Sequence, residues 1–417
     1  MTIPKQLTGL ITFACLSITM PVRAQQMVAT APMLGTGITQ SVTPRAADNW
    51  KLSDLMQLET DRLGQVWVLD YVDKSLRLFS ERGKLIRVVA KMDEPDGAFT
   101  RSSSMQMLGD TLWISDNDRT LATPFSLTGF PLPNTRKQFG IGHTSRGLSP
   151  GGRFFRFEPF PTDAPAKRMA RTIVHVPNGA VVPQTVLTIA DRAHPPVSAR
   201  MYNPAYAATP FTNAGYSSRQ QPFDDRDLYV LGAGGQSYVV VERSATRITT
   251  VNPRTWFIPQ AEVRIVEVGL KGDTLFDRRY LVPAVPLSAA RVNAALDTIT
   301  RELEASHQGN QRVYAPDLRD SLFVPKIWPP ITDILIGTDG SFWLRQPSAP
   351  AQTARYWRIA HDGTILLPAS VDANLEIARV STNRILGYIS NGAAESVIQW
   401  LEVVPVPTTA QPRTPPI

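Results

Sequence analysis

The chain of 417 residues has 43 Lys and Arg residues against 36 Asp and Glu residues, which gives a formal net charge of +7. The basic residues are spread along the chain without a run of four, and this pattern does not predict a nucleic-acid interface. Cys15 is the only cysteine, so disulfides within the chain and zinc fingers are excluded. The folded part must therefore rest on its own hydrophobic core.

The first residues have the order of a secretory signal peptide. Lys5 precedes an uncharged, mostly apolar run from Leu7 to Met20, and small or tolerated residues lead to Ala24. We predict a signal peptide over residues 1–24, cleavage after Ala24, and a secreted or periplasmic mature protein. Lipidation at Cys15 is the alternative, but the residues before it fit a lipidation motif poorly. Since no apolar run reaches the roughly 20 residues that span a bilayer, we predict no transmembrane segment.

From residue 61 onward the chain repeats one pattern, in which a turn with Gly, Asp or Asn precedes a short apolar strand that holds a large aromatic residue. Most copies are followed by a second apolar run that ends in a glycine turn. Short apolar runs bounded by turn residues indicate antiparallel strands, and the aromatic ring fills the wedge between neighbouring sheets. The copies begin at Asp61, Gly109, Pro150, Asp225, Thr338 and Thr382.

These copies predict an all-β fold, a six-bladed β-propeller with Pro-rich loop insertions and one short inserted helix, over residues 50–404. A single sheet of this kind cannot cover both of its faces, whereas radial stacking of about six sheets buries the faces and shortens the exposed edges. Residues 25–49 form a lead-in segment, and residues 27–39 within it could supply an outer strand that closes the ring. The blades are expected at residues 50–94, 98–137, 146–192, 223–270, 328–370 and 372–404.

The first copy carries a resemblance to a known family. The pattern Asp61-x-x-Gly64-x-Val-Trp-Val-x-Asp70, followed by Leu-x-Leu-Phe-x-x-x-Gly83-Lys84, resembles the NHL/TolB-like six-bladed propellers of secreted bacterial proteins. The resemblance is clear over residues 55–130 and 326–403 and faint over residues 146–270. It implies the fold but no single function, because those propellers include binding modules and several unrelated enzymes.

Two of the three insertions are rich in Pro, at residues 157–168 and 194–222, and we expect both to be long loops. Three aromatic side chains of the second insertion either anchor the loop on the ring or form part of a binding rim, and these are Tyr202, Tyr206 and Tyr216.

The third insertion is predicted to be a helix that Ser288 caps and that runs to Ser306. Val292, Leu296, Ile299 and Leu303 would share one apolar stripe, which we expect to pack against the ring. The tail, residues 405–417, is too rich in Pro to form a sheet.

One set of polar residues follows the repeated aromatic positions at a constant spacing of three residues. These residues would lie at the ends of equivalent strands, on one face, where a polar ring could bind a ligand or a cation. The alternative is that their side chains stabilise the next hairpin turn through its backbone amides. The Asp116-Asn117-Asp118 run resembles part of a calcium loop but lacks the later ligands of one. The ring comprises Asp70, Asp116, Glu158, Gln346 and Asn391, with Gly232 at the fourth copy.

No Gly-x-Ser-x-Gly elbow, phosphate-binding loop or zinc-protease motif occurs, and the five histidines form no pair at metal-ligand spacing. The first hypothesis is therefore a noncatalytic binding or scaffold propeller for a protein, peptide or glycan ligand. The alternative is a metal-dependent hydrolase of the lactonase or esterase type, in which a divalent cation such as Ca²⁺ would act in the central channel. A structural component docked to a surface assembly is a third hypothesis. The hydrolase requires Asp, Glu, Asn or His side chains that converge in one channel, whereas the binding module requires an exposed aromatic or apolar patch.

Overall fold

The structure is a computed structural model, and it divides the chain into two compact units, residues 1–31 and 32–417. The predicted signal peptide and the Pro-rich tail lie outside the described residues, all of which belong to the second unit. No helix in the described part is long and apolar enough to cross a membrane. The described residues are 34, 40–44, 50–53, 56–72, 74–91, 103–116, 121–132, 137–138, 145–149, 152–157, 170–177, 184–190, 194–202, 204, 215–249, 259–306, 311–347, 353–390 and 395–403.

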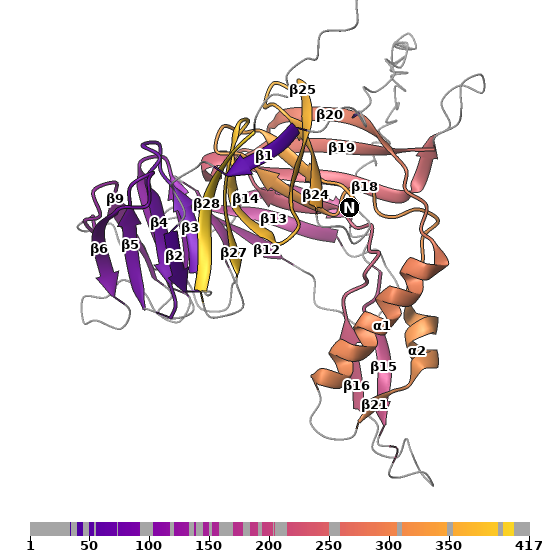
Figure 1. The fold of residues 1–417 in the computed structure, drawn as a ribbon. Helices are drawn as coiled ribbons and strands as arrows, with labels where there is room; N and C mark the ends of the chain where they lie inside the picture. Colours follow the sequence, from indigo (N-terminus) through magenta and orange to yellow (C-terminus); the bar gives the residue numbers. More distant parts are fainter. Residues whose placement is uncertain are drawn as a thin grey trace, which may run out of the picture. The chain divides into compact units, whose positions relative to one another are not determined.

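The predicted all-β class is confirmed, since most elements are strands of antiparallel sheets (Figure 1). Four of the sheets contain four strands each, in chain order. The first has β3 (Met56–Thr60), β4 (Val66–Asp70), β5 (Ser75–Phe79) and β6 (Leu85–Lys91), and the second has β7 (Ser103–Leu108), β8 (Thr111–Asp116), β9 (Leu121–Ser126) and β10 (Lys137–Gln138). The third has β11 (Ser145–Ser149), β12 (Gly152–Phe157), β13 (Ala170–Pro177) and β14 (Gln184–Ala190), and the fourth has β17 (Leu228–Leu231), β18 (Ser237–Thr249), β19 (Gln260–Gly269) and β20 (Thr274–Pro283).

The last two repeats are joined through strands from the beginning of the chain. β1 (Gln40–Pro44) pairs in parallel with β25 and antiparallel with β28, and β2 (Trp50–Ser53) also pairs with β28. Residues 50–53, which the sequence pattern assigns to the first blade, therefore belong to the last sheet. The fourth sheet likewise extends to residue 283 rather than 270. The strands of the last two repeats are β22 (Asp333–Ile336), β23 (Phe342–Arg345), β24 (Thr353–Ile359), β25 (Ile365–Asp372), β26 (Leu375–Val380), β27 (Arg384–Ser390) and β28 (Glu395–Val403).

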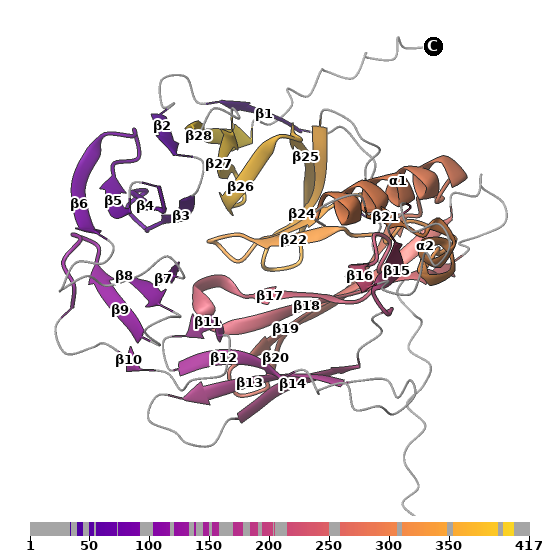
Figure 2. The same ribbon diagram turned by 90° about the horizontal axis from the view of Figure 1, so that it is seen from below.

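The first strands of successive sheets contact one another in a cyclic order. β3 contacts β7, β7 contacts β11, and β11 contacts the short 3-10 helix η2 (Ala233–Gly235) that follows β17. β17 contacts β22, β22 contacts β26, and β26 contacts β3. Figure 2 shows these strands nearest to the centre of the group of sheets. They will be called the inner strands.

The hydrophobic core lies between neighbouring sheets, as the repeated aromatic positions predict. Trp67 packs with Leu76 of its own sheet and with Ile114 and Phe125 of the next, and all four are fully or almost fully buried. The indole Nε1 of Trp67 donates a hydrogen bond to the Asp61 carboxylate at 3.2 Å. Burial of a large ring contributes more than burial of any aliphatic side chain, so these positions fix how one sheet sits on the next.

The two insertions at residues 194–222 and 288–327 fold together, which the sequence pattern did not predict. β15 (Val197–Tyr202) pairs with β16 (Gly215–Arg219) and with β21 (Arg312–Val313), so the expected Pro-rich loop is a hairpin. Helix α1 (Ala289–Ala305) confirms the predicted helix, and its Ser288 cap accepts a hydrogen bond from the Arg291 amide. The short helix α2 (Ala315–Ser321) was not predicted.

The apolar stripe of α1 packs on the hairpin rather than on the ring. Leu296, Ile299 and Leu303 are buried in one cluster with Val197, Ala199 and Met201 of β15. Every second residue of β15 is buried, which is the pattern of a strand with one covered face. The expectation that the helix covers the propeller was therefore wrong, because the nearest unpartnered apolar face is supplied by the other insertion.

Candidate functional site

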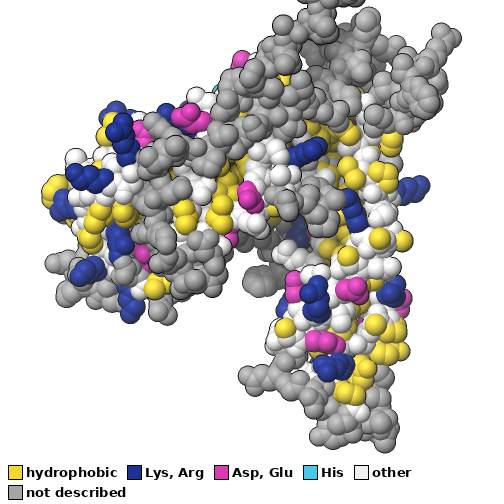
Figure 3. All heavy atoms as spheres, viewed as in Figure 1, with side chains coloured by type: hydrophobic (Ala, Val, Ile, Leu, Met, Phe, Trp, Pro, Cys, Tyr) yellow, Lys and Arg dark blue, Asp and Glu magenta, His cyan; other side chains and the backbone are white. Residues whose placement is uncertain are grey.

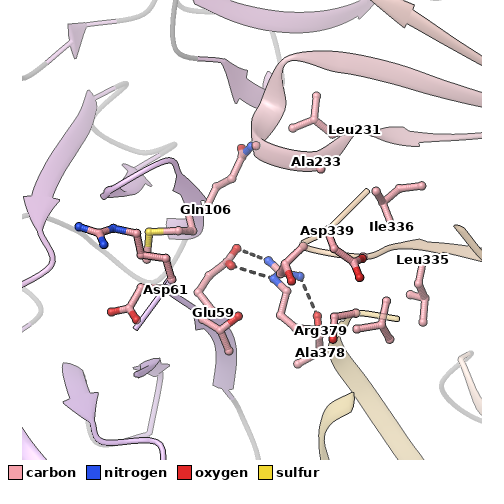
Figure 4. A pocket seen from close by; sticks show the side chains of 18 of the residues that line it. Glu59, Asp61, Gln106, Leu231, Ala233, Leu335, Ile336, Asp339, Ala378 and Arg379 are labelled. Atoms are coloured by element: carbon pink, nitrogen blue, oxygen red, sulfur yellow. Dashed lines mark hydrogen bonds and ion pairs between the residues drawn. The ribbon is translucent and has the colours of Figure 1, made fainter. Parts of the chain in front are cut away.

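The inner strands and the turns that follow them surround a cavity of about 1070 Å³ (Figure 4). Its walls come from the carboxyl ends of β3, β17, β22 and β26, from most of β7 and from η2. These elements belong to four different sheets, so residues far apart in the sequence meet at this one place. A concave site of this size with a few polar groups is typical of ligand-binding pockets.

The polar part of the cavity is built around one ion pair between two inner strands. Nε of Arg379 on β26 donates to the Glu59 carboxylate of β3 at 2.7 Å, and a second guanidinium nitrogen donates to the other oxygen of Glu59. The third nitrogen donates to the Ala378 carbonyl at 2.7 Å. In Figure 4 both charged side chains extend into the cavity between the two strands.

The two members of this pair differ in burial. The Glu59 side chain is 3 % exposed, whereas the Arg379 side chain is 36 % exposed and forms part of the cavity surface. Burial by itself lowers the pKa of Arg379, but the charge and the hydrogen bonds of Glu59 outweigh this effect and raise the pKa above its usual value. The guanidinium is therefore permanently charged, fixed in place by a bidentate contact, and accessible to a ligand.

Apolar residues also line the cavity. They include Val230 and Leu231 at the end of β17 and Leu335 and Ile336 at the end of β22. Gln106 on β7 adds an amide on the polar side, and Figure 4 shows it across the cavity from Ile336. A ligand in this cavity would thus meet both hydrogen-bonding groups and aliphatic side chains.

The aspartates at the rim stabilise turns. Asp61 accepts hydrogen bonds from the amides of Leu63 and Gln65 at 2.9 and 3.0 Å, and burial raises the pKa of Asp61. Burial also acts to raise the pKa of Asp339, but hydrogen bonds from Thr382 and Ser341 outweigh it, so that the pKa of Asp339 is lowered. These carboxylates are engaged with backbone amides, which is the usual role of Asp in such turns.

Among the described aspartates of the predicted polar ring, Asp70 lies at the end of its strand away from the cavity, whereas Asp116 follows Ser115, which lines the cavity. Asp70 is the last residue of β4, and Asp116 is the last residue of β8. Asp70 pairs in register with Met56 at the beginning of β3, whereas the cavity lies beyond the other end of β3, at Thr60. Both aspartates are buried, and Asp70 accepts a hydrogen bond from the Val72 amide at 3.0 Å, as the turn-stabilising alternative predicts.

Of the other ring positions, Glu158 and Asn391 lie outside the described residues. The backbone amide of Gln346 donates to the Arg355 carbonyl at 2.9 Å, and its side chain is half-buried. Gly232 lines the cavity instead, because it follows the inner strand of its sheet. Ligand binding by the ring stays a prediction.

The tyrosines of the second insertion belong to the hairpin. Tyr202 is half-buried at the end of β15, where it pairs in register with Arg312. Tyr216 lies in β16 opposite Arg200, and Tyr206 is outside the described residues. Tyr202 does not line the cavity, and the role of the tyrosines in a binding rim also stays a prediction.

Within the described part of the chain, no group of three or more His, Cys, Asp or Glu side chains lies close enough together to hold a metal ion. The Asn117 and Asp118 positions of the calcium-like fragment are outside that part. His175 is buried in β13, and burial lowers its pKa. His361 lies 3.7 Å from the Glu267 carboxylate but is largely exposed.

The sequence reasoning missed Glu59, Arg379 and Gln106. A signal was present, since Met56-Gln-Leu-Glu-Thr60 and Leu375-Glu-Ile-Ala-Arg379 each place a charged residue just before a turn, in an inner strand. The constant spacing from the aromatic residue of the second strand instead points to residues such as Asp70, at the end of β4 away from the cavity.

Comparisons with known proteins give no family assignment. No known protein family and no curated protein matches the chain. Among solved structures, the chain is similar to a protein from Bacteroides fragilis that is described as exported, with a TM-score of 0.40 and 9 % identity over 88 % of this chain and 95 % of that one. It is also similar to virginiamycin B lyase from Staphylococcus aureus, with a TM-score of 0.35 and 10 % identity over 85 % and 99 % of the two chains.

A member of the DUF4221 family from Bacteroides vulgatus has a TM-score of 0.34 and 10 % identity over 88 % of this chain and 98 % of that one. Because these TM-scores are below 0.5, the likenesses carry no argument about this chain. The fold rests on the sheet topology and on the contacts between the inner strands.

Proposed function

We propose that this chain is an exported six-bladed β-propeller of the NHL/TolB-like type that binds a protein, peptide or glycan ligand without catalysis. The observation that carries the proposal is the cavity where the inner strands end. Six inner segments in cyclic contact, with β1 and β2 pairing to the last repeat, support the number of blades. The order of charged, apolar and small residues at the N-terminus supports export.

The lining of the cavity suits a ligand with many hydrogen-bonding groups and little net charge. Glu59 neutralises Arg379, so a charged ligand would have to compete with an existing ion pair. Peptide amides and sugar hydroxyls can accept hydrogen bonds from the guanidinium without breaking that pair. The aliphatic wall of Leu231, Leu335 and Ile336 would at the same time cover apolar side chains or the faces of sugar rings.

The test is binding of the purified chain to peptide and glycan arrays, compared with a variant whose cavity is filled. Ser104 lies on β7, lines the cavity and has an exposed side chain, so Ser104→Trp should occupy the cavity without disturbing the core. Thr353→Trp makes a similar change at an exposed strand position that does not line the cavity.

We expect ligands that bind the wild type and Thr353→Trp, and bind Ser104→Trp at least tenfold more weakly. Equal binding to all three proteins would show that the cavity is not the binding site. Conversion of a bound array ligand to a product would show that the chain is an enzyme, and would contradict the noncatalytic part of the proposal.

A further inference from the structure

The outer strand of the first sheet has an edge and an apolar surface that the described part of the chain leaves uncovered. β6 is the last strand in the order β3-β4-β5-β6, and it pairs only with β5 among the described strands. Edge strands present unpaired N–H and C=O groups, to which another extended chain can pair.

The apolar side chains of β6 are unusually exposed for their type. Leu85, Ile86 and Val88 are 46–50 % exposed, and Phe130 beside them is 54 % exposed. Phe130 belongs to the turn after β9, and the Arg87 guanidinium lies over its ring at 3.9 Å. Val89 lies close to Gly129 of the same turn. β6 and this turn thus form one continuous surface, which will be called the β6 surface.

The β6 surface carries basic side chains. Strand β6 contains Arg87 and Lys91 and no acidic residue. Arg82 and Lys84 precede it in the turn, together with Glu81, which is paired with Arg384 at 2.8 Å. Figure 3 shows Lys and Arg side chains interspersed with hydrophobic ones at the left end of the view, where Figure 1 labels β6 and β5. The basic residues on β6 and in the turn before it are Arg82, Lys84, Arg87 and Lys91.

From the edge that the described strands leave unpaired, the exposed apolar side chains and the charge, we propose that the β6 surface binds an extended segment of a partner protein that carries both acidic and apolar residues. The segment pairs with the free edge of β6 and extends the first sheet by one strand. Its acidic side chains meet the basic residues, and its apolar side chains cover Ile86, Val88 and Phe130. A second copy of this chain does not fit, because two β6 edges would bring Arg87 and Lys91 against like charges.

The experiment selects peptides of roughly eight residues, the length of a typical strand, from a random displayed library on the purified chain. The selected peptides are then tested on the double variant Ile86→Glu and Val88→Glu. Both positions are half exposed, so the changes lower the positive charge of the surface and remove two apolar side chains without opening the core. Leu367→Glu on β25 is the matched control, because Leu367 is 48 % exposed on a different sheet.

We expect enriched peptides that carry both acidic and apolar residues, that bind the wild type and Leu367→Glu, and that bind the double variant at least tenfold more weakly. Methylation of alternate peptide amides should weaken binding by a similar factor, because it removes the hydrogen bonds of an added strand. The proposal is wrong if the methylated peptides bind equally well, or if no peptide distinguishes the double variant from the control. Binding to vesicles of anionic phospholipid without peptide enrichment would assign the surface to a membrane instead and would also overturn it.

Discussion

The pair of Glu59 and Arg379 gives the sharpest prediction about stability, because its two members are buried to different extents. Arg379→Met removes the cation and leaves a carboxylate that is 3 % exposed without its bidentate partner. Loss of one partner of a buried pair costs about 3–5 kcal/mol, because the remaining charge is uncompensated. Since the cavity lets water approach this carboxylate from the side of Arg379, we expect the lower end, about 3 kcal/mol.

The reverse change should cost less. Glu59→Met leaves a guanidinium that is already 36 % exposed and whose long stem can move its charge into the cavity water. We expect a loss of about 1 kcal/mol, and the double variant should lie within about 1 kcal/mol of the wild type because neither charge remains.

The assay is urea unfolding at pH 7, followed by Trp fluorescence, for the wild type, the two single variants and the double variant. The free energies of unfolding give the coupling between the two residues directly. A larger loss for Glu59→Met than for Arg379→Met would refute the reasoning from burial. Additive losses in the double variant would show that the two side chains do not form a stabilising pair.

Three further changes test the fold around the cavity. Gly340→Ala should cost about 1–2 kcal/mol in thermal unfolding, and more than Gly109→Ala. Both glycines have positive φ, but only at Gly340 would the new Cβ meet a neighbour, His361 Nδ1 at 2.8 Å. Equal losses in the two variants would show that this contact is not the cause. Arg243→Met should lower the free energy of unfolding in urea by about 3 kcal/mol, because buried Arg243 donates to the carbonyls of Arg226, Asp224 and Ile331. Wild-type stability in Arg243→Lys would contradict a role for the planar guanidinium. Burial raises the pKa of Asp61 above 3.8, so Asp61 keeps its proton to a higher pH in the folded state than in the unfolded state. The free energy of unfolding of the wild type relative to Asp61→Asn should therefore fall as pH rises from 3.8 through the folded pKa. A difference in unfolding free energy that does not change with pH would contradict this sign.

The sequence determined the strands, many of the turns and the helix of the third insertion, because these depend on local patterns. Trp67 and Trp343 are buried between sheets as their repeated position predicts, and Ser288 caps α1. Each of these features is decided by residues within a few positions of one another, and periodicity therefore reveals them.

The tertiary structure alone decided which elements meet. Residues 50–53 pair with β28 near the other end of the chain, and the two insertions bury each other through Met201 and Leu303. Glu59 and Arg379 are 320 positions apart, yet they form the centre of the cavity. A local pattern states that a strand has an apolar face or that a charge precedes a turn, but it does not state which distant face or charge lies opposite. That choice follows from the packing of all the sheets together, and it places the candidate site at the end of the inner strands.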